Sequence, residues 1–110
     1  MNDTYPQVVS RYFSAAERCD LQVLDSCFTD GATLTDDGRT YQGRAQIHAW
    51  RQAAGPAYEY VVEVLDWART ADGTFVVNTN VASTVSGDPV ALTFRFTLDG
   101  QLISGLQISP

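Results

Sequence analysis

The chain has 110 residues, of which 45% are hydrophobic and 18% are charged, so its size and composition are those of one globular domain over 1–110 with a single core. Thirteen acidic residues oppose seven basic residues, and the net charge of −6 argues against nucleic acid and anionic membranes as partners. All the basic residues are arginine, which excludes Schiff-base chemistry and a P-loop, and the lack of a signal-peptide pattern predicts a cytoplasmic location.

Two helices are predicted at the start of the chain. Asp20 is the expected N-cap of a short second helix, which Asp30-Gly31 should end. The first helix begins where Thr4 and Gln7 form a capping box. Its apolar side chains recur at helical spacing and form one stripe: Tyr5, Val8, Val9, Tyr12, Phe13 and Ala16.

A short hairpin is predicted next. A strand over 32–35 leads into the turn Asp36-Asp37-Gly38-Arg39, and a brief return strand covers 40–42. A third helix should begin just after Gly43 and stop at Gly55-Pro56.

The hydrophobic period changes from 3.6 to 2 after residue 57, which predicts four long antiparallel strands. Three turn dipeptides separate them: Asp72-Gly73, Gly87-Asp88 and Asp99-Gly100. Helices followed by a meander of strands indicate the α+β class. A sheet of long strands covered by helices on one side tends to curl, and the space under its concave face becomes either a core or a pocket.

Two residues have the chemistry for proton transfer. Asp36 closes the first short strand, and it is either a solvated turn residue or a carboxylate that points into the pocket as a general base. Tyr12 lies on the apolar stripe of the first helix, and it is either a core tyrosine or a hydrogen-bond donor to an oxygen on which negative charge develops. The residue pattern leaves these alternatives open.

Other polar residues have ordinary structural explanations. Alternation along the strand predicts that Asn78 and Asn80 face solvent. His48 is expected at the surface of the third helix, and Glu59 and Glu63 are expected to form a solvated acidic stripe. One histidine and two cysteines at unsuitable spacing predict no metal site.

Several stretches of the sequence carry a family resemblance. They are VVSRYF at 8–13, DL at 20–21, FTDGATLTD at 28–36 and GRAQI at 43–47, with a weaker likeness up to Phe94-Arg95-Phe96. Through them the chain resembles the nuclear transport factor 2-like superfamily, also called SnoaL-like, and within it the bacterial Δ5-3-ketosteroid isomerases. The resemblance implies a cone-shaped fold in which three N-terminal helices pack on a curved, mostly antiparallel sheet and enclose a pocket.

The resemblance also implies roles for individual residues. In ketosteroid isomerases an Asp matching Asp36 moves a proton between two carbons, while a Tyr matching Tyr12 donates to the dienolate oxygen. Leu92 stands where those enzymes have a protonated Asp as second donor, and Arg51 stands where they have a supporting Tyr. Loss of one such donor costs about 10²-fold or more in rate, so efficient steroid isomerisation is not expected.

The predicted activity is isomerase-like or cyclase-like proton transfer at a carbon next to a carbonyl, on a small hydrophobic or carbonyl-containing molecule. No metal or organic cofactor is needed for it. The same alignment places Asn78 and Asn80 on the pocket face, which reverses the expectation from alternation and suggests a more polar ligand. The expected apolar walls of the pocket are Phe13, Phe28, Trp50 and Leu92.

Two other functions remain open. The chain could be a non-catalytic module that binds a small hydrophobic ligand, with the outer face of the sheet forming a homodimer as is common in the superfamily. An epoxide hydrolase of the limonene type would need a carboxylate, Arg, carboxylate relay, for which Asp36, Arg95 and Asp66 supply the residue types. Arg95 has the wrong strand parity for that relay.

Overall fold

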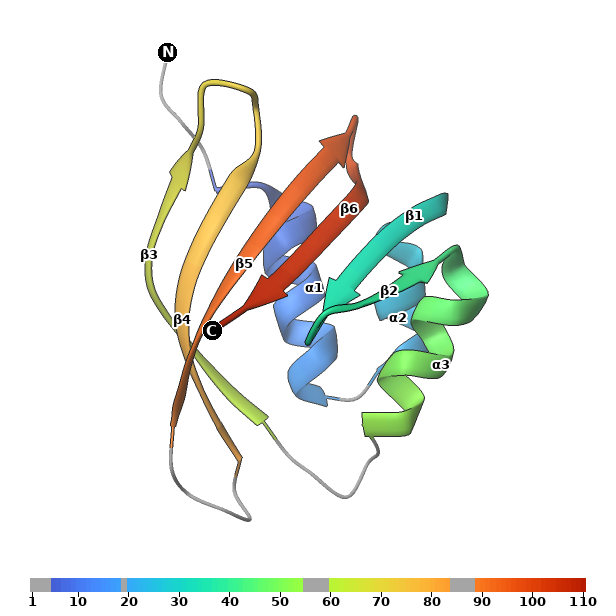
Figure 1. The fold of residues 1–110 in the computed structure, drawn as a ribbon, viewed down its shortest axis with the longest axis horizontal. Coiled ribbons are helices and arrows are strands. Elements are labelled where there is room, and N and C mark those ends of the chain that lie inside the picture. The colour runs from blue at the N-terminus through green and yellow to red at the C-terminus, as the bar shows by residue number, and fades with distance from the viewer. Residues whose placement is uncertain (1–4, 19, 55–59, 84–88) are drawn as a thin grey trace.

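A computed structural model describes residues 5–18, 20–54, 60–83 and 89–110 and shows helices packed on one face of a curved six-stranded sheet (Figure 1). The helices are α1 (Gln7–Arg18), α2 (Leu21–Ser26) and α3 (Arg44–Ala54). The strands are β1 (Phe28–Asp36), β2 (Arg39–Gln42), β3 (Tyr60–Arg69), β4 (Phe75–Ser83), β5 (Val90–Asp99) and β6 (Leu102–Ser109). The predicted α+β class and cone-shaped architecture are confirmed. None of the described helices is long and apolar enough to cross a membrane.

The first helix buries the face that its spacing predicts. Val8, Val9, Tyr12, Phe13 and Ala15 of α1 are all buried, because residues three and four apart share one side of a helix. The proposed cap at Thr4 lies outside the described residues.

The second helix starts as predicted but ends earlier. The Asp20 side chain accepts a hydrogen bond from the backbone N–H of Val23 at 3.3 Å, which is the expected N-cap. The predicted end at Asp30-Gly31 is wrong, because the helix stops at Ser26 and β1 begins at Phe28. Phe28 is fully buried and pairs with Ile103 of β6, a long-range contact that overrides the local signal.

The hairpin between β1 and β2 is confirmed, and it fixes the direction of Asp36. Asp36 pairs with Arg39 across a turn in which Asp37 and Gly38 have φ values of 54° and 77°. Positive φ at both central residues is the requirement of a type I′ turn, and Asp-Gly meets it. The third helix then starts at Arg44 as predicted, whereas its predicted stop at Gly55-Pro56 lies outside the described residues.

The sheet has the order β2-β1-β6-β5-β4-β3, and β1 and β6 form its one parallel pair among the described strands. The turns at Gly73 and Gly100 have φ values of 89° and 63°, as the predicted turn dipeptides require. The Gly87-Asp88 turn lies outside the described residues. The chain therefore returns after the meander to place β6 beside β1, which brings the end of the chain next to the Asp36 turn.

The core lies between the helices and the concave face of the sheet (Figure 1). Alternation in β4 directs Phe75, Val77 and Thr79 toward the helices, where each is at most 1% exposed. At the edge of the sheet, the backbone N–H of Val62 in β3 donates to the Glu17 carboxylate of α1 at 2.7 Å. This bond ties the end of α1 to the edge strand and sets the spacing between helix and sheet.

Candidate functional site

A hollow of about 180 Å³ lies between the three-helix layer and the sheet, at the end of the core nearest the β1–β2 turn. Helices α1 and α3 line one side of it and the sheet lines the other, where Asp36 at the end of β1 lies beside its register partner Ile108 of β6. The described residues that line it are Tyr12, Phe13, Ala16, Asp36, Trp50, Arg51, Val62, Val81, Leu92, Phe94 and Ile108. Asp36 and Tyr12 therefore line one hollow, although they come from different elements.

Asp36 faces the hollow because of its place in β1. It shares a strand face with Ala32 and Leu34, both of which are buried against the helices. Its Oδ2 accepts a hydrogen bond from Trp50 Nε1 at 3.0 Å, so the carboxylate is held by α3 as well as by its own strand. The side chain is half-buried, which leaves one end of the hollow accessible to solvent.

Tyr12 forms the deep end of the hollow. It is 2% exposed, and the rings of Phe13, Phe28 and Phe96 lie edge-on to it with centroids 5.4, 6.0 and 5.6 Å away. Burial raises the pKa of Tyr12 well above its ordinary value; the Arg51 guanidinium lowers that pKa and the Asp36 carboxylate raises it. The phenol is therefore protonated near neutral pH and available as a donor.

Arg51 is a charged residue of the site that the sequence analysis placed at the position of a supporting Tyr but did not include among the site residues. Its side chain is 4% exposed, and Nη2 donates to the backbone oxygen of Ala16 at 2.6 Å. That carbonyl belongs to the last turn of α1, where backbone carbonyls have no hydrogen-bond partner within the helix. A signal was present: Ile47, Trp50 and Arg51 have i, i+3 and i+4 spacing, which puts an arginine on the apolar face of the third helix.

The predicted pocket lining is partly wrong. Phe13, Trp50 and Leu92 line the hollow, but Phe28 lies behind Tyr12 in the core. Asn78 and Asn80 lie on the opposite, outer face of β4, because strict alternation holds along this strand and Thr79 between them points to the helices.

The outer-face position of Asn78 is fixed by its neighbours. Asn78 Nδ2 donates to Asp66 Oδ1 at 2.6 Å, and Thr93 Oγ1 donates to Asn78 Oδ1 at 2.9 Å. Both neighbours are its register partners on the adjacent strands. Arg95 is exposed on the same outer face, so Asp66 and Arg95 are separated from Asp36 by the sheet and the epoxide hydrolase relay is not formed.

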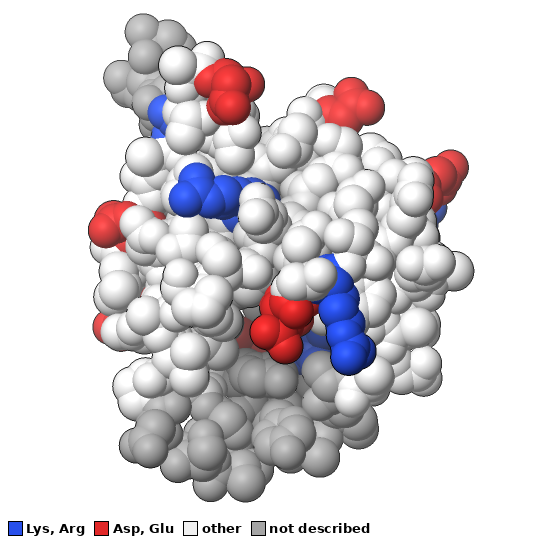
Figure 2. All heavy atoms as spheres, viewed as in Figure 1, with Lys and Arg blue, Asp and Glu red and all other residues white. Residues whose placement is uncertain are grey.

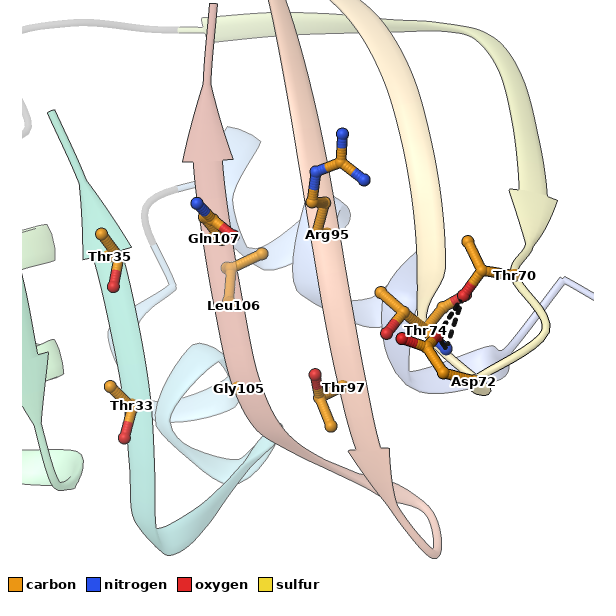
Figure 3. Close-up of a pocket in the computed structure, with 10 residues that line it drawn as sticks. All are labelled: Thr33, Thr35, Thr70, Asp72, Thr74, Arg95, Thr97, Gly105, Leu106 and Gln107. Carbon is orange, nitrogen blue, oxygen red and sulfur yellow. Dashed lines mark hydrogen bonds between the residues drawn. The ribbon is translucent and has the colours of Figure 1, made fainter. Parts of the chain in front are cut away.

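A second, larger hollow of about 390 Å³ crosses this outer face, and we call it the outer groove. Figure 3 shows its lining: Thr33 and Thr35 on β1, Gly105, Leu106 and Gln107 on β6, Arg95 and Thr97 on β5, and Thr70, Asp72 and Thr74 at the β3–β4 turn. Asp72 accepts hydrogen bonds from the Thr70 hydroxyl and the Thr74 backbone N–H, and these bonds lower its pKa. The Asp72 carboxylate is therefore bonded within the β3–β4 turn.

The two hollows differ in the environment of their charges. The charged side chains that line the outer groove, Asp72 and Arg95, are exposed. In the space-filling view, most of this side of the molecule is uncharged, and its acidic and basic side chains are scattered over the surface (Figure 2). Charges in water have little effect on a reaction, whereas charges in an apolar hollow act strongly. The inner hollow is therefore the candidate site.

His48 has the surface position expected for it. Its Nδ1 lies 2.7 Å from Asp25 Oδ2, and this contact joins α3 to α2 away from the hollow. Glu63 is exposed on β3, as predicted, and Glu59 lies outside the described residues.

Comparison with known proteins identifies relatives of this architecture. The structure is similar to that of a proposed polyketide cyclase from Sinorhizobium meliloti, with 33% identity, coverage of 96% of this chain and 95% of that chain, and a TM-score of 0.85. It is also similar to a protein of ketosteroid isomerase-like fold from Catenulispora acidiphila, solved with trimethylamine (23% identity, 97% and 87% coverage, TM-score 0.80). No curated protein matches the sequence.

The family model for the SnoaL-like domain matches residues 9–105, which include both Tyr12 and Asp36. The match covers all the described helices and strands except the first residues of α1 and the last residues of β6. With a family match over most of its length and the SnoaL-like architecture in its structure, the chain belongs to the SnoaL-like family.

Proposed function

We propose that the chain catalyses proton transfer at a carbon next to a carbonyl group, with Asp36 as general base and Tyr12 as donor to the carbonyl oxygen. The observation that carries this proposal is that a carboxylate and a protonated phenol from different elements line one largely apolar hollow. The similarity to a proposed polyketide cyclase and to a protein of ketosteroid isomerase-like fold supports the same reaction class.

The proposed reaction has two proton transfers. With a β,γ-unsaturated ketone, the Asp36 carboxylate takes a proton from the carbon between the carbonyl and the double bond, and the electron pair of the broken C–H bond moves toward the carbonyl oxygen to form a dienolate. The Tyr12 hydroxyl donates a hydrogen bond to the resulting oxyanion. Asp36 then returns its proton to the γ carbon, so the double bond moves into conjugation and the base is regenerated.

Trp50 and Arg51 support these two groups in the proposal. The Trp50 indole N–H holds one carboxylate oxygen of Asp36, which restrains the rotation of the base. Arg51 lowers the pKa of Tyr12 against the effect of burial, and a phenol of lower pKa is a stronger hydrogen-bond donor to an oxyanion. Leu92 lines the hollow as an apolar group, so it adds no second donor.

The experiment follows the conversion of cyclohex-3-en-1-one, a β,γ-unsaturated ketone, to its conjugated isomer by absorbance. Asp36→Asn should lower kcat by about 10²–10⁴-fold, the usual range for loss of a general base. Asp37→Asn is the matched control, because Asp37 is the exposed neighbour in the same turn and Asn also tolerates its positive φ. Equal rates for wild type and Asp36→Asn would contradict the proposal.

The second candidate is a non-catalytic module that binds a small hydrophobic ligand in the same hollow. The observation in its favour is the apolar side chain of Leu92 in the wall of the hollow. The ketosteroid isomerases that the sequence resembles have an acid at this position. Ketones that raise the melting temperature of the wild type without any conversion of cyclohexenone would support this module and contradict the enzyme.

A further inference from the structure

We infer that the inner hollow accepts carbonyl compounds with a single ring and excludes fused two-ring and four-ring ones. This inference names the substrate class of the site and rests on the proposed function for the orientation of the carbonyl. The limit comes from the size of the hollow, from a deep wall that is packed against the core, and from the separation of its polar and apolar sides.

The volume sets the first limit. The hollow measures about 180 Å³. A cavity of roughly 150 Å³ lined by apolar side chains holds one benzene molecule, whereas sites for drug-sized ligands measure roughly 300–1,000 Å³. One six-membered ring with a carbonyl oxygen and a small substituent therefore fills this hollow, and a second fused ring would have to remain outside it.

The deep wall is held by aromatic packing. The Phe13 and Phe94 rings meet edge-on with centroids 5.0 Å apart, and Phe94 stacks on Phe96 at 6.2 Å with an interplanar angle of 13°. These rings are at most 6% exposed. Rings packed on several sides at interior density have no free volume to move into, so this wall does not retreat from a larger ligand.

The shallower wall comes from the sheet and is apolar. Val62, Val81 and Leu92 line it, and each is only half-buried. The hydroxyl of Thr79, which is buried beside this wall, donates to the Leu92 carbonyl at 2.9 Å and is occupied inside the sheet. Shortening Leu92 therefore enlarges the hollow without touching its polar groups.

The polar groups lie away from this wall. Tyr12 comes from α1, Arg51 from α3 and Asp36 from the end of β1, which is separated from β5 by β6. A bound ring therefore places its carbonyl toward the helices and the end of β1, and its hydrocarbon part toward strands β3 to β5. The matching class is a one-ring ketone of about six to ten non-hydrogen atoms with no polar group opposite the carbonyl.

Binding of saturated ketones tests this class without depending on catalysis. Cyclohexanone, 2-decalone and androstanedione have one, two and four rings and carry no double bond for the enzyme to move. The probe is the indole N–H signal of Trp50 in NMR titrations, because this group contacts Asp36 at the hollow. Trp67 of β3 is not among the lining residues and serves as an internal control.

On an open surface the larger ketones would bind more tightly, because they bury more apolar area. A hollow that holds only one ring removes that advantage and penalises ketones whose further rings do not fit. We expect cyclohexanone to shift the Trp50 signal with a Kd at least about tenfold lower than that of 2-decalone, and androstanedione to leave it unchanged. Leu92→Ala should reduce the gap between the one-ring and two-ring ketones to less than about threefold. Val81→Ala on β4, a second enlargement of the same wall, should act in the same direction. Leu98→Ala should not, because Leu98 lies on β5 with Leu92 but does not line the hollow.

Two results would overturn the inference: 2-decalone or androstanedione binding the wild type as tightly as cyclohexanone, or cyclohexanone leaving the Trp50 signal unchanged. If the binding order is as expected but cyclohexenone is not isomerised, the proposed reaction fails and the size limit stands.

Discussion

The inner hollow and the outer groove lie on opposite faces of the same sheet, and the larger of the two is the less suited to chemistry. The outer groove has about twice the volume of the inner one, 390 Å³ against 180 Å³. Its charged side chains, Asp72 and Arg95, are exposed, whereas Tyr12 and Arg51 of the inner hollow are 2% and 4% exposed. Removal of polar groups from water, rather than the volume of a hollow, therefore decides where a reaction is favoured.

The largest expected effect concerns the packing behind the inner hollow. Phe96 is fully buried and its ring contacts those of Tyr12 and Phe13. Phe96→Ala should lower the free energy of unfolding by about 3–5 kcal/mol, measured by chemical denaturation, because it leaves a cavity in the core. Thr97→Ala, the exposed neighbour in the outer groove, should change it by less than about 0.5 kcal/mol. Similar losses for the two variants would contradict the contrast between the faces.

Removal of the Tyr12 hydroxyl is the next effect in size. Tyr12→Phe keeps the buried ring and removes only the donor, so kcat for a one-ring ketone should fall by about 10²–10³-fold. Thr97→Val removes a hydroxyl from the outer groove and should leave kcat unchanged. The steady-state absorbance assay compares the two variants. An equally large loss of rate in Thr97→Val would indicate that the reaction takes place in the outer groove.

Tyr12 should also make the free energy of unfolding depend on pH above about pH 10. Burial raises the pKa of Tyr12 above the value of about 10 that it has in the unfolded chain. The stabilisation from a neutral phenol is therefore complete below pH 10 and is lost as the pH rises above it, by up to about 1.4 kcal/mol per pH unit. Tyr12→Phe should show a shallower loss above pH 10 in denaturant titrations. Tyr5, whose pKa burial also raises, is present in both proteins and cancels. Identical slopes would indicate that Tyr12 is accessible to water.

The smallest expected effect is on the melting temperature, from a substitution beside Asp72 in the outer groove. Hydrogen bonds from Thr70 and Thr74 lower the pKa of Asp72, so its carboxylate stabilises the fold above the ordinary Asp pKa, and this contribution is lost as the pH falls through the lowered value. Thr70→Val should weaken it and lower the melting temperature slightly more at pH 7 than at pH 2. No change in kcat is expected, and a change would indicate that the groove takes part in the reaction.

Local patterns predicted the elements that carry the inner hollow but left the direction of the Asp36 carboxylate open. Asp36 follows the buried Ala32 and Leu34 at a spacing of two, yet it also opens the Asp37-Gly38 turn, where an exposed carboxylate is equally ordinary. Tyr12 lies on a helical stripe that is buried in any packing of α1. These placements depend on contacts close in sequence.

The errors depend on contacts distant in sequence. The early end of α2 follows from the pairing of Phe28 with Ile103, which are 75 residues apart in number, and no local signal shows that pairing. The outer position of Asn78 and Asn80 follows from which face of β4 meets the helices; plain alternation predicted it, and alignment with a distant family reversed it. Arg51 was visible as a charge on an apolar face, but its burial depends on the end of α1 supplying the Ala16 carbonyl.

Asp36 and Tyr12 are proposed to act on the same small molecule inside the inner hollow. A structure with bound phenol, a one-ring mimic of the dienolate, tests this proposal. We expect the phenol oxygen within about 3 Å of Tyr12 Oη, the distance of an O–H···O hydrogen bond, with the ring beside the Asp36 carboxylate and against Leu92. Phenol bound in the outer groove with the inner hollow unoccupied would contradict it.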